Sequence, residues 1–386
     1  RCTHRRQRQM CIRDRLWGGP ALAAEKEPGT WPRFRGPAGS GTSGPAVPVE
    51  LGKETRAWSV PLPGSGTSSP VLWGGRLFVT GEDREKGVVT LACLDTATGR
   101  TLWANILPSG KYRTHKMNNA AAASPAVADG LVVQTWYDSG KGRAVLSAFD
   151  HDGKALWSYE IGEFKGSHGL NVQPVIHDGR VLLVHLHQKG GYVCALDAAN
   201  GRPVWKKDYP EASPKTTYIT PLVRERSDGR EEVVVAATSI GVRGIDFANG
   251  EELWQLPGVF KERCIVSPID ILSGSGSEGA LVTVGCKNNV FFAVRPPEAR
   301  GGQPEIEWRL PKHAPYVPTP VSDGRTLYVL SDGGVLSALD ARTWEERWQE
   351  KLPANFYASP LLLGGKLYCL SREGECFVVE VGEGFK

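Results

Sequence analysis

Residues 93–103 read CLDTATGRTLW, in which an aspartate is followed by a glycine and then by a tryptophan at four-residue steps. Near copies stand at residues 148–157 (AFDHDGKALW), 195–205 (ALDAANGRPVW), 244–254 (GIDFANGEELW) and 338–348 (ALDARTWEERW). An aspartate at this place can accept backbone N–H groups in an Asx turn, and the glycine supplies a positive φ. Each copy therefore predicts a turn that joins two strands and delivers a tryptophan to the same place in every unit.

The tryptophan of each unit is expected to pack between neighbouring units. A buried indole removes about 150–250 Å² from water, and its N–H needs an acceptor. We therefore predict a structural docking role for the pattern and not a cofactor site. The predicted docking residues are Trp58, Asp95, Gly99, Trp103, Asp150, Gly153, Trp157, Asp197, Gly201, Trp205, Asp246, Gly250, Trp254, Trp308, Asp340 and Trp348.

A second marker, a small or polar residue followed by proline, keeps step with the tryptophans. It occurs once per unit, at Ser69-Pro70, Ser124-Pro125, Gln173-Pro174, Thr220-Pro221, Ser267-Pro268, Thr319-Pro320 and Ser359-Pro360. Two independent markers that share a period of about 40–55 residues indicate a repeat architecture.

Each unit contains four short apolar runs. In the first unit these runs are 70–73, 76–80, 88–94 and 102–107, and turn signals such as Gly74-Gly75 separate them. Repeated four-stranded antiparallel units predict an all-β protein with the β-propeller fold. Seven blade units are visible, and we expect eight in the intact protein. The alternative is a seven-bladed ring that the segment around Trp58 closes by supplying the last strand.

The start of the chain differs from the rest. Residues 1–27 contain an arginine-rich stretch and Ala21-Leu22-Ala23, which is typical of a signal-peptide cleavage site, so we expect a non-native or signal-remnant head without structure. Residues 28–52 are expected to form an extended leader. Residues 53–386 are expected to form a single propeller domain that is truncated at its C-terminal end. The protein is accordingly expected to be secreted across the inner membrane into the periplasm or cell envelope.

The charge of the chain argues against nucleic acid as a partner. The net charge is +4, and residues 1–15 hold six arginines and one aspartate, which gives 6 − 1 = +5. The rest of the chain therefore carries 4 − 5 = −1 and has no basic stripe for phosphate contacts. No apolar run approaches the roughly 18 residues that span a bilayer.

The cysteines outside the head are Cys93, Cys194, Cys264, Cys286, Cys369 and Cys376. None has the spacing of a zinc site, and we expect free, buried thiols. Only Cys369 and Cys376 flank a common turn. A two-residue turn at Glu373-Gly374 would place Cys369 opposite Val378 and leave the two thiols diagonal, too far apart for a disulfide.

The A-x-D-x-x-x-G-x-x-x-W pattern resembles the tryptophan-docking motif of the pyrroloquinoline-quinone (PQQ)-like propeller family. Residues 31–43 (WPRFRGPAGSGTS) resemble the leader of secreted PQQ-like repeat proteins of planctomycete-type bacteria. The resemblance covers about residues 31–386. The family includes the B subunit of the outer-membrane β-barrel assembly machinery, a scaffold, and the longer quinoprotein alcohol dehydrogenases.

The resemblance implies two functions of different classes. Quinoprotein dehydrogenases carry a vicinal cysteine pair, a catalytic aspartate and a calcium site, and none of these can be matched to residues of this chain. We therefore expect no catalytic residue, no metal and no bound PQQ. The favoured function is a non-catalytic binding or scaffold propeller of the bacterial cell envelope; a PQQ- or metal-dependent oxidoreductase is the alternative.

A binding site in a propeller is expected at one mouth of the central channel. The segments that enter each innermost strand occupy equivalent places in the repeat, so their side chains should converge on one face. An envelope protein, a peptide or a polar small molecule would suit them; alternatively, they only cap the ends of the blades. The candidate mouth residues are Arg113, His115, Lys116, Asn118, His168, Asn171, Tyr218, Arg263, Tyr316 and Tyr357.

Overall fold

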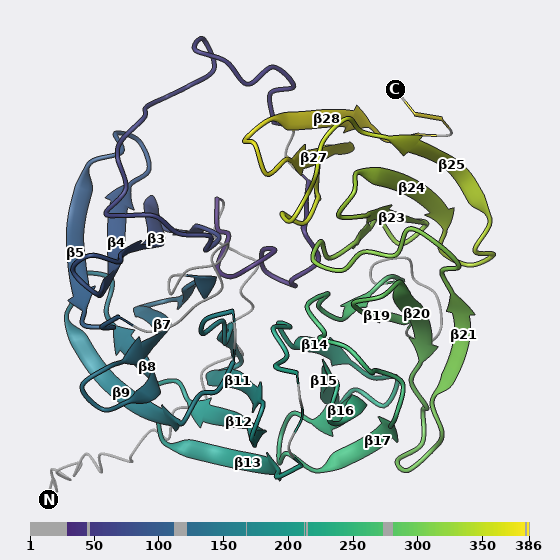
Figure 1. Cartoon of the computed structure of the whole chain (residues 1–386), viewed down its shortest axis with the longest axis horizontal. Helices are drawn as coiled ribbons and strands as arrows, with labels where there is room; N and C mark the ends of the chain where they lie inside the picture. The colour runs from purple at the N-terminus through teal and green to yellow at the C-terminus, as the bar shows by residue number, and fades with distance from the viewer. Residues whose placement is uncertain are drawn as a thin grey trace, which may run out of the picture.

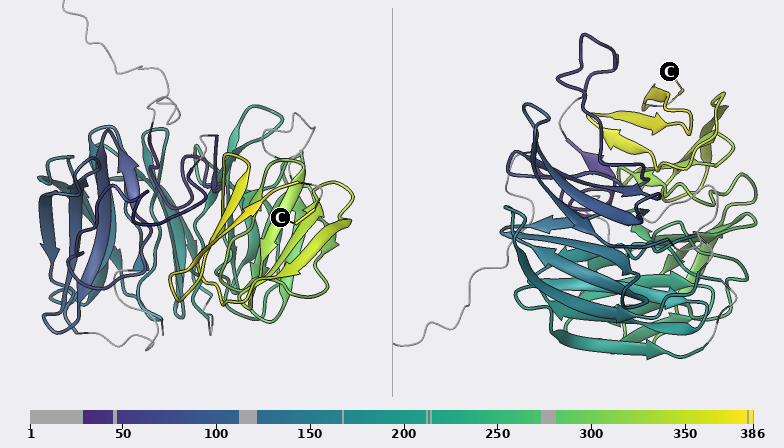
Figure 2. Two further views of the ribbon diagram at one scale, coloured as in Figure 1. Left: turned by 90° about the horizontal axis from the view of Figure 1, so that it is seen from above. Right: turned by 60° about the vertical axis from the view of Figure 1, so that its left-hand side comes forward.

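The computed structural model describes residues 29–44, 47–111, 122–166, 168–211, 213, 215–272, 281–382 and 384–385. The regular elements of these residues are the strands β1 to β28, which form seven sheets of four strands each. The sheets stand around a common axis as the blades of a propeller (Figures 1 and 2). The predicted fold class is therefore confirmed. No helix in the described ranges has the length and apolarity needed to cross a bilayer.

Blades 1 to 6 each consist of four consecutive antiparallel strands, and Figure 1 shows the last strand of each on the rim of the disc. Blade 1 contains β2 (Val71–Trp73), β3 (Arg76–Asp83), β4 (Val88–Asp95) and β5 (Thr101–Leu107). Blade 2 contains β6 (Ala126–Ala128), β7 (Leu131–Asp138), β8 (Arg143–Phe149) and β9 (Ala155–Gly162). Blade 3 contains β10 (Val175–His177), β11 (Arg180–His187), β12 (Gly190–Asp197) and β13 (Pro203–Tyr209).

The second half of the ring repeats this order until blade 7. Blade 4 contains β14 (Leu222–Glu225), β15 (Glu231–Ala237), β16 (Gly241–Asp246) and β17 (Glu252–Leu256). Blade 5 contains β18 (Ile269–Asp270), β19 (Val282–Cys286), β20 (Val290–Arg295) and β21 (Glu305–Arg309). Blade 6 contains β22 (Val321–Ser322), β23 (Thr326–Leu330), β24 (Val335–Asp340) and β25 (Glu346–Lys351). Blade 7 contains β26 (Leu361–Leu363), β27 (Lys366–Leu370) and β28 (Cys376–Glu380), with β1 (Thr42–Ser43) added beside β26.

Burial follows the position of a strand within its blade. The middle strands, such as β11 and β15, are buried along most of their length because a neighbouring blade covers each face. The rim strands, such as β5 and β9, alternate exposed with less exposed residues. The apolar core accordingly lies in layers between blades: one layer joins blades 1 and 2, another joins blades 6 and 7. This layering is why one period of sequence is one blade.

The residues before proline connect the blades near the axis. The backbone N–H of Ser69 donates to Oγ of Ser124 in the next blade at 2.8 Å, and the N–H of Ser124 donates to Oε1 of Gln173 at 3.0 Å. The same contact joins Thr220 to Ser267 (3.0 Å), Ser267 to Thr319 (3.1 Å) and Thr319 to Ser359 (2.9 Å). The residues of the second sequence marker therefore form hydrogen bonds from one blade to the next, along blades 1 to 3 and again along blades 4 to 7.

The leader crosses the hub of the ring and connects its two ends (Figure 1). Trp31 pairs with Leu72 of blade 1 through two hydrogen bonds of 2.9 Å, and β1 pairs with β26 of blade 7 in parallel. Between these points Arg35 is almost fully buried and donates to the carbonyl oxygens of Thr319 (2.9 Å) and Pro360 (3.4 Å). Burial lowers the pKa of the Arg35 guanidinium to about 9. The leader is therefore part of the ring and joins first and last blades.

Trp58 does not complete blade 7. It lies in no strand, and within the described residues β28 pairs only with β27. Val60 packs instead on Val79, Ala92 and Leu94, on the face of blade 1 that turns away from blade 2. In Figure 1 no sheet stands between β28 and β5; the N-terminal segment passes there. The prediction of an eighth blade remains a prediction.

The register of the last hairpin differs from the expected one. Cys369 pairs with Phe377, and Cys376 pairs with Leu370, because the turn runs from Ser371 to Glu375 with a 2.7 Å bond between their backbone N–H and C=O groups. The expected two-residue turn was therefore wrong. All six cysteines outside the head are free.

Candidate functional site

Four of the predicted docking tryptophans make one and the same contact with the blade that follows. The indole N–H groups of Trp58, Trp103, Trp157 and Trp205 donate at 2.8–3.0 Å to the carbonyls of Thr96, His151, Ala198 and Phe247, respectively. Each acceptor is the first residue after the aspartate of the turn. This aspartate caps the turn with its carboxylate, as when Asp95 Oδ1 accepts the N–H of Thr98 at 2.8 Å.

The indole ring of the preceding tryptophan packs closely against the turn glycine. A Cβ atom at Gly99, Gly153 or Gly250 would approach the tryptophan ring to 2.7 Å, and one at Gly201 to 2.4 Å. These four glycines also have φ between 71° and 84°, where a side chain is strained. Two features therefore favour glycine at this position: the positive φ of the turn and the close approach of the indole ring. That the contact holds the blades together stays a prediction, which the Discussion tests.

The joints around blades 6 and 7 use other contacts. Trp344 occupies the glycine position of blade 6 with a φ of 65°, and its ring stacks on Trp308 with centroids 4.7 Å apart and planes 4° apart. The indole N–H of Trp348 donates to the carbonyl of Gly382 at 3.3 Å, and Phe385 lies against its ring.

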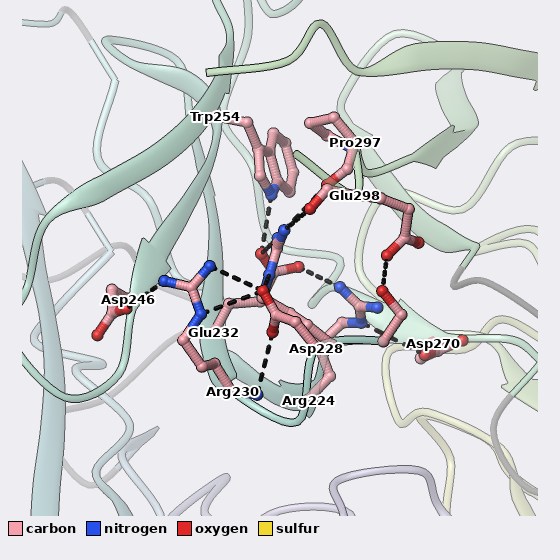
Figure 3. Close-up of polar contacts among 11 residues, drawn as sticks. Arg224, Asp228, Arg230, Glu232, Asp246, Trp254, Asp270, Pro297 and Glu298 are labelled. Atoms are coloured by element: carbon pink, nitrogen blue, oxygen red, sulfur yellow. Dashed lines mark hydrogen bonds and ion pairs between the residues drawn. The ribbon is translucent and has the colours of Figure 1, made fainter. Parts of the chain in front are cut away.

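The joint between blades 4 and 5 contains a buried carboxylate (Figure 3). Blade 5 has lost the Asp–Gly turn, and Trp254 donates instead to Oε2 of Glu232 in its own blade at 2.9 Å. Glu232 is fully buried, and it forms ion pairs with Arg224 and, at 2.8 Å, with Arg226. Arg226 continues to the carbonyls of Glu298 (2.5 Å) and Pro297 (3.3 Å) in blade 5. An ionic network thus occupies the place of the missing turn.

Four candidate mouth residues gather on one face across blades 3 to 6. The His168 and Tyr218 rings are perpendicular with centroids 6.2 Å apart, and the Arg263 guanidinium lies 5.9 Å from the Tyr218 centroid. Arg263 also donates to the hydroxyl of Tyr316 at 3.1 Å, and the Lys287 ammonium lies 5.9 Å from the ring of Tyr316. We call these five residues the mouth cluster. Burial raises the pKa of the Tyr218 hydroxyl, so this group stays neutral and can donate a hydrogen bond.

The remaining candidates have no contact with the mouth cluster among the described interactions. Asn171 Oδ1 accepts the side-chain amide of Gln173 at 2.7 Å, so it belongs to the ring of contacts near the axis. Tyr357 is 42 % exposed, and the guanidinium of Arg372 lies 4.5 Å from its ring centroid. Arg113, His115, Lys116 and Asn118 fall outside the described residues.

A pocket of about 720 Å³ adjoins the mouth cluster between blades 5 and 6. Most of its lining residues were not among the predicted mouth residues, which all stand on the segments that enter innermost strands. The turns between second and third strands also reach this face, as antiparallel order requires. Asn288-Asn289 and Asp332-Gly333-Gly334 are turn signals that mark these places in the sequence. The lining residues are Lys287, Asn288, Asn289, His313, Ala314, Tyr316, Ser331, Asp332, Gly333, Val335 and Lys351.

The described residues do not fit a quinone with its calcium. Such a site needs acidic and amide side chains that converge on a metal, and no three His, Cys, Asp or Glu side chains of the described ranges gather to hold an ion. Arg35 lies buried at the hub, where its donors are taken by backbone carbonyls. The absence of a cofactor and of catalysis remains a prediction.

Comparison with known proteins relates the chain to an outer membrane protein assembly factor and to an alcohol dehydrogenase. A family model described as "Outer membrane protein assembly factor BamB" matches residues 48–206, 85–263 and 301–384. The outer membrane protein assembly factor BamB of Moranella endobia is 23% identical over 255 residues, which are 59% of this chain and 60% of that protein. The quinohemoprotein alcohol dehydrogenase ADH-IIG of Pseudomonas putida is 23% identical over 254 residues, 61% of this chain but only 32% of the enzyme. The chain thus spans less than two thirds of either relative.

Among solved structures, BamB from Moraxella catarrhalis is similar, with a TM-score of 0.54 and 18% identity. The match covers 82% of this chain and 83% of that one. At this identity the likeness shows the propeller fold alone.

Proposed function

The chain belongs to the family described as outer membrane protein assembly factor BamB, and on this premise we propose that it is a non-catalytic, protein-binding scaffold of the bacterial cell envelope. The observation that carries the proposal is the mouth cluster. It places two tyrosines, a histidine and two cations from four blades on one face.

The composition of the mouth cluster supports binding of a protein. Tyrosine and arginine are the residue types that dominate the affinity of protein interfaces, because they combine large contact area with hydrogen bonding. The contacts within the cluster hold these side chains in place before a partner arrives, which reduces the entropy lost on binding. Tyr357, on a link that reaches the same face, extends the surface.

The envelope location rests on the family and on the expected secretion of the chain. The family model and the Moranella relative are both named for assembly of outer-membrane proteins. We infer that this protein likewise acts outside the inner membrane.

A capture experiment tests the proposal. Purified protein is immobilised and exposed to a native envelope extract, and the retained proteins are compared with those retained by a Tyr316→Ala/Tyr357→Ala double variant. Loss of two interface tyrosines should reduce a specific partner by about tenfold or more. Leu156→Ala is the matched control, since Leu156 is 48 % exposed on the rim strand β9 and far in the repeat from this face. Equal capture by wild type, double variant and control would contradict the proposed binding face.

The second candidate is a quinone-dependent oxidoreductase, which the alcohol dehydrogenase relative favours. Purified protein would be incubated with PQQ and calcium and offered alcohols together with an artificial electron acceptor. We expect background rates, because the described residues offer no site for the metal. Stoichiometric binding of PQQ, with turnover that disappears on chelation, would replace the scaffold proposal by the enzyme.

A further inference from the structure

The pocket beside the mouth cluster is a built cavity between two blades. Asn289 holds its wall: its side chain donates to the carbonyl of Pro311 at 3.0 Å and accepts the N–H of Ala314 at 2.7 Å. These bonds fasten the β19–β20 turn of blade 5 to the segment that leads into blade 6. On the other side, the Asp332 carboxylate accepts the backbone N–H of Tyr316 at 2.7 Å. The cavity is therefore shaped by side-chain to backbone bonds before any ligand binds.

Cations border this cavity. Lys287 and Lys351 both line it and both are exposed. Lys351 uses one of its donors on the carbonyl of Gly333, which leaves two for a ligand. The lining carboxylate, Asp332, spends one oxygen on backbone N–H groups of Tyr316 and Val317. The surface thus presents a surplus of positive charge and favours an anionic ligand.

The lining of the cavity also includes apolar groups. Ala314, Val335 and the Tyr316 ring are partly exposed there. The cavity is also continuous with the mouth cluster, because Lys287 and Tyr316 belong to both. A ligand that combines carboxylates with apolar side chains and extends along the face matches these features better than an isolated small anion.

We propose that this pocket binds an acidic peptide segment of a partner protein, with Lys287 and Lys351 on its carboxylates and Tyr316 beneath an apolar side chain. The inference deepens the proposed scaffold function and names the chemistry of the partner. Specificity for acidic sequence would come from the two ammonium groups, while apolar contact would come from Ala314, Val335 and Tyr316.

Fluorescence anisotropy of the full-length protein tests this inference. The probe is a dye-labelled hexapeptide that alternates glutamate and leucine, and the neutral counterpart carries glutamine in place of glutamate. We expect saturable binding of the acidic peptide, weakened by added salt because the charges are exposed. The Lys287→Gln/Lys351→Gln double variant should weaken binding about fivefold to tenfold, which corresponds to about 1–1.4 kcal/mol for the two exposed ion pairs together.

A matched double variant controls for net charge. Lys53→Gln/Lys154→Gln removes the same two charges at exposed positions outside the pocket and should leave binding unchanged. Circular dichroism of all variants should be superimposable. Equal binding of both peptides, equal binding by both double variants, or no binding of the acidic peptide up to millimolar concentration would each overturn the inference. Tight binding of citrate that excludes the peptide would also overturn it, since the pocket would then be a small-anion site.

The outcome is separable from that of the scaffold proposal. If the acidic peptide does not bind, while Tyr316→Ala/Tyr357→Ala still loses its captured partner, the acidic ligand is refuted and the binding face stands. If the wild type binds the acidic peptide, the Lys287→Gln/Lys351→Gln variant loses this binding, and the tyrosine variant still captures its partner, the proposed binding face is refuted and the peptide pocket stands.

Discussion

Replacing Glu232 by glutamine should weaken the contact between blades 4 and 5 and so lower the free energy of unfolding. The side chain keeps its shape, because glutamine has nearly the same size as glutamate. The carboxylate is fully buried, and the Arg224 and Arg226 side chains that it neutralises are only 8% and 2% exposed. Glutamine removes the charge and turns one acceptor into a donor that faces guanidinium or indole N–H groups. Two buried cations then lose their shared counter-ion.

The magnitude follows from the remaining partners. Breaking a buried ion pair by removing one member destabilises a protein by about 3–5 kcal/mol. Arg224 retains Asp270 at 3.6 Å, and Arg226 retains Asp228 at 3.7 Å and the carbonyls of Pro297 and Glu298. We therefore expect the lower end, about 3 kcal/mol, which is a large part of the roughly 5–15 kcal/mol that stabilises a typical domain.

Urea unfolding followed by tryptophan fluorescence measures this loss. Glu160→Gln is the control, because Glu160 is 46% exposed in its ion pair with Arg143 and should contribute under about 1 kcal/mol. A triple variant with Arg224→Met, Arg226→Met and Glu232→Leu removes the three charges of the triad together and should recover part of the stability. The recovery is incomplete because Asp270 loses Arg224 and the Trp254 N–H loses its acceptor. If the free energy of unfolding of Glu232→Gln lies within about 0.5 kcal/mol of the wild-type value, the buried carboxylate does not hold this joint.

Three further predictions concern stability and thiols. Gly201→Ala should lower the free energy of unfolding by about 2–4 kcal/mol, because its Cβ would lie 2.4 Å from Trp157, whereas Gly179→Ala, with a similar φ and open space, should cost about 1 kcal/mol; equal losses would contradict the docking contact. Burial lowers the pKa of His185 to about 3, so the unfolded state binds more protons below about pH 6.5. Stability should therefore fall by about 1.4 kcal/mol per pH unit from pH 6.5 toward pH 3, measured by urea unfolding, and a His185→Gln variant that keeps this slope would refute the assignment. Thiol titration of the denatured, unreduced protein should find all six cysteines outside the head reactive, and a lower number would reveal a disulfide.

The repeat could be predicted because its determinants are local. The aspartate, glycine and tryptophan of each turn stand within eleven residues of one another, and their turn chemistry depends on that stretch alone. The same holds for the residues before proline. The family and the propeller fold followed from these markers.

Other features depend on residues far apart in the chain. Arg35 contacts the carbonyl of Thr319 across 284 positions, and nothing in the leader sequence indicates that acceptor. Trp254 follows the usual pattern, yet its acceptor is Glu232, because the blade that follows lacks the usual turn. Trp344 at a glycine position is visible in the sequence, but its stack on Trp308 is not.

The candidate site was predictable only where it lies on the segments between blades. His168, Tyr218, Arg263 and Tyr316 were found because such segments occupy equivalent places in the repeat. Lys287 and the rest of the pocket lining come from turns inside blades, which a search of the segments between blades does not reach.

Site-specific photocrosslinking in the bacterial envelope tests the scaffold proposal most directly. A photoreactive phenylalanine analogue replaces either Tyr357, exposed on the proposed binding face, or Ala199, exposed in the β12–β13 turn on the opposite face. The scaffold proposal predicts a discrete crosslinked envelope protein from position 357 and none from position 199. The same crosslinks from both positions, or crosslinks from position 199 alone, would contradict it.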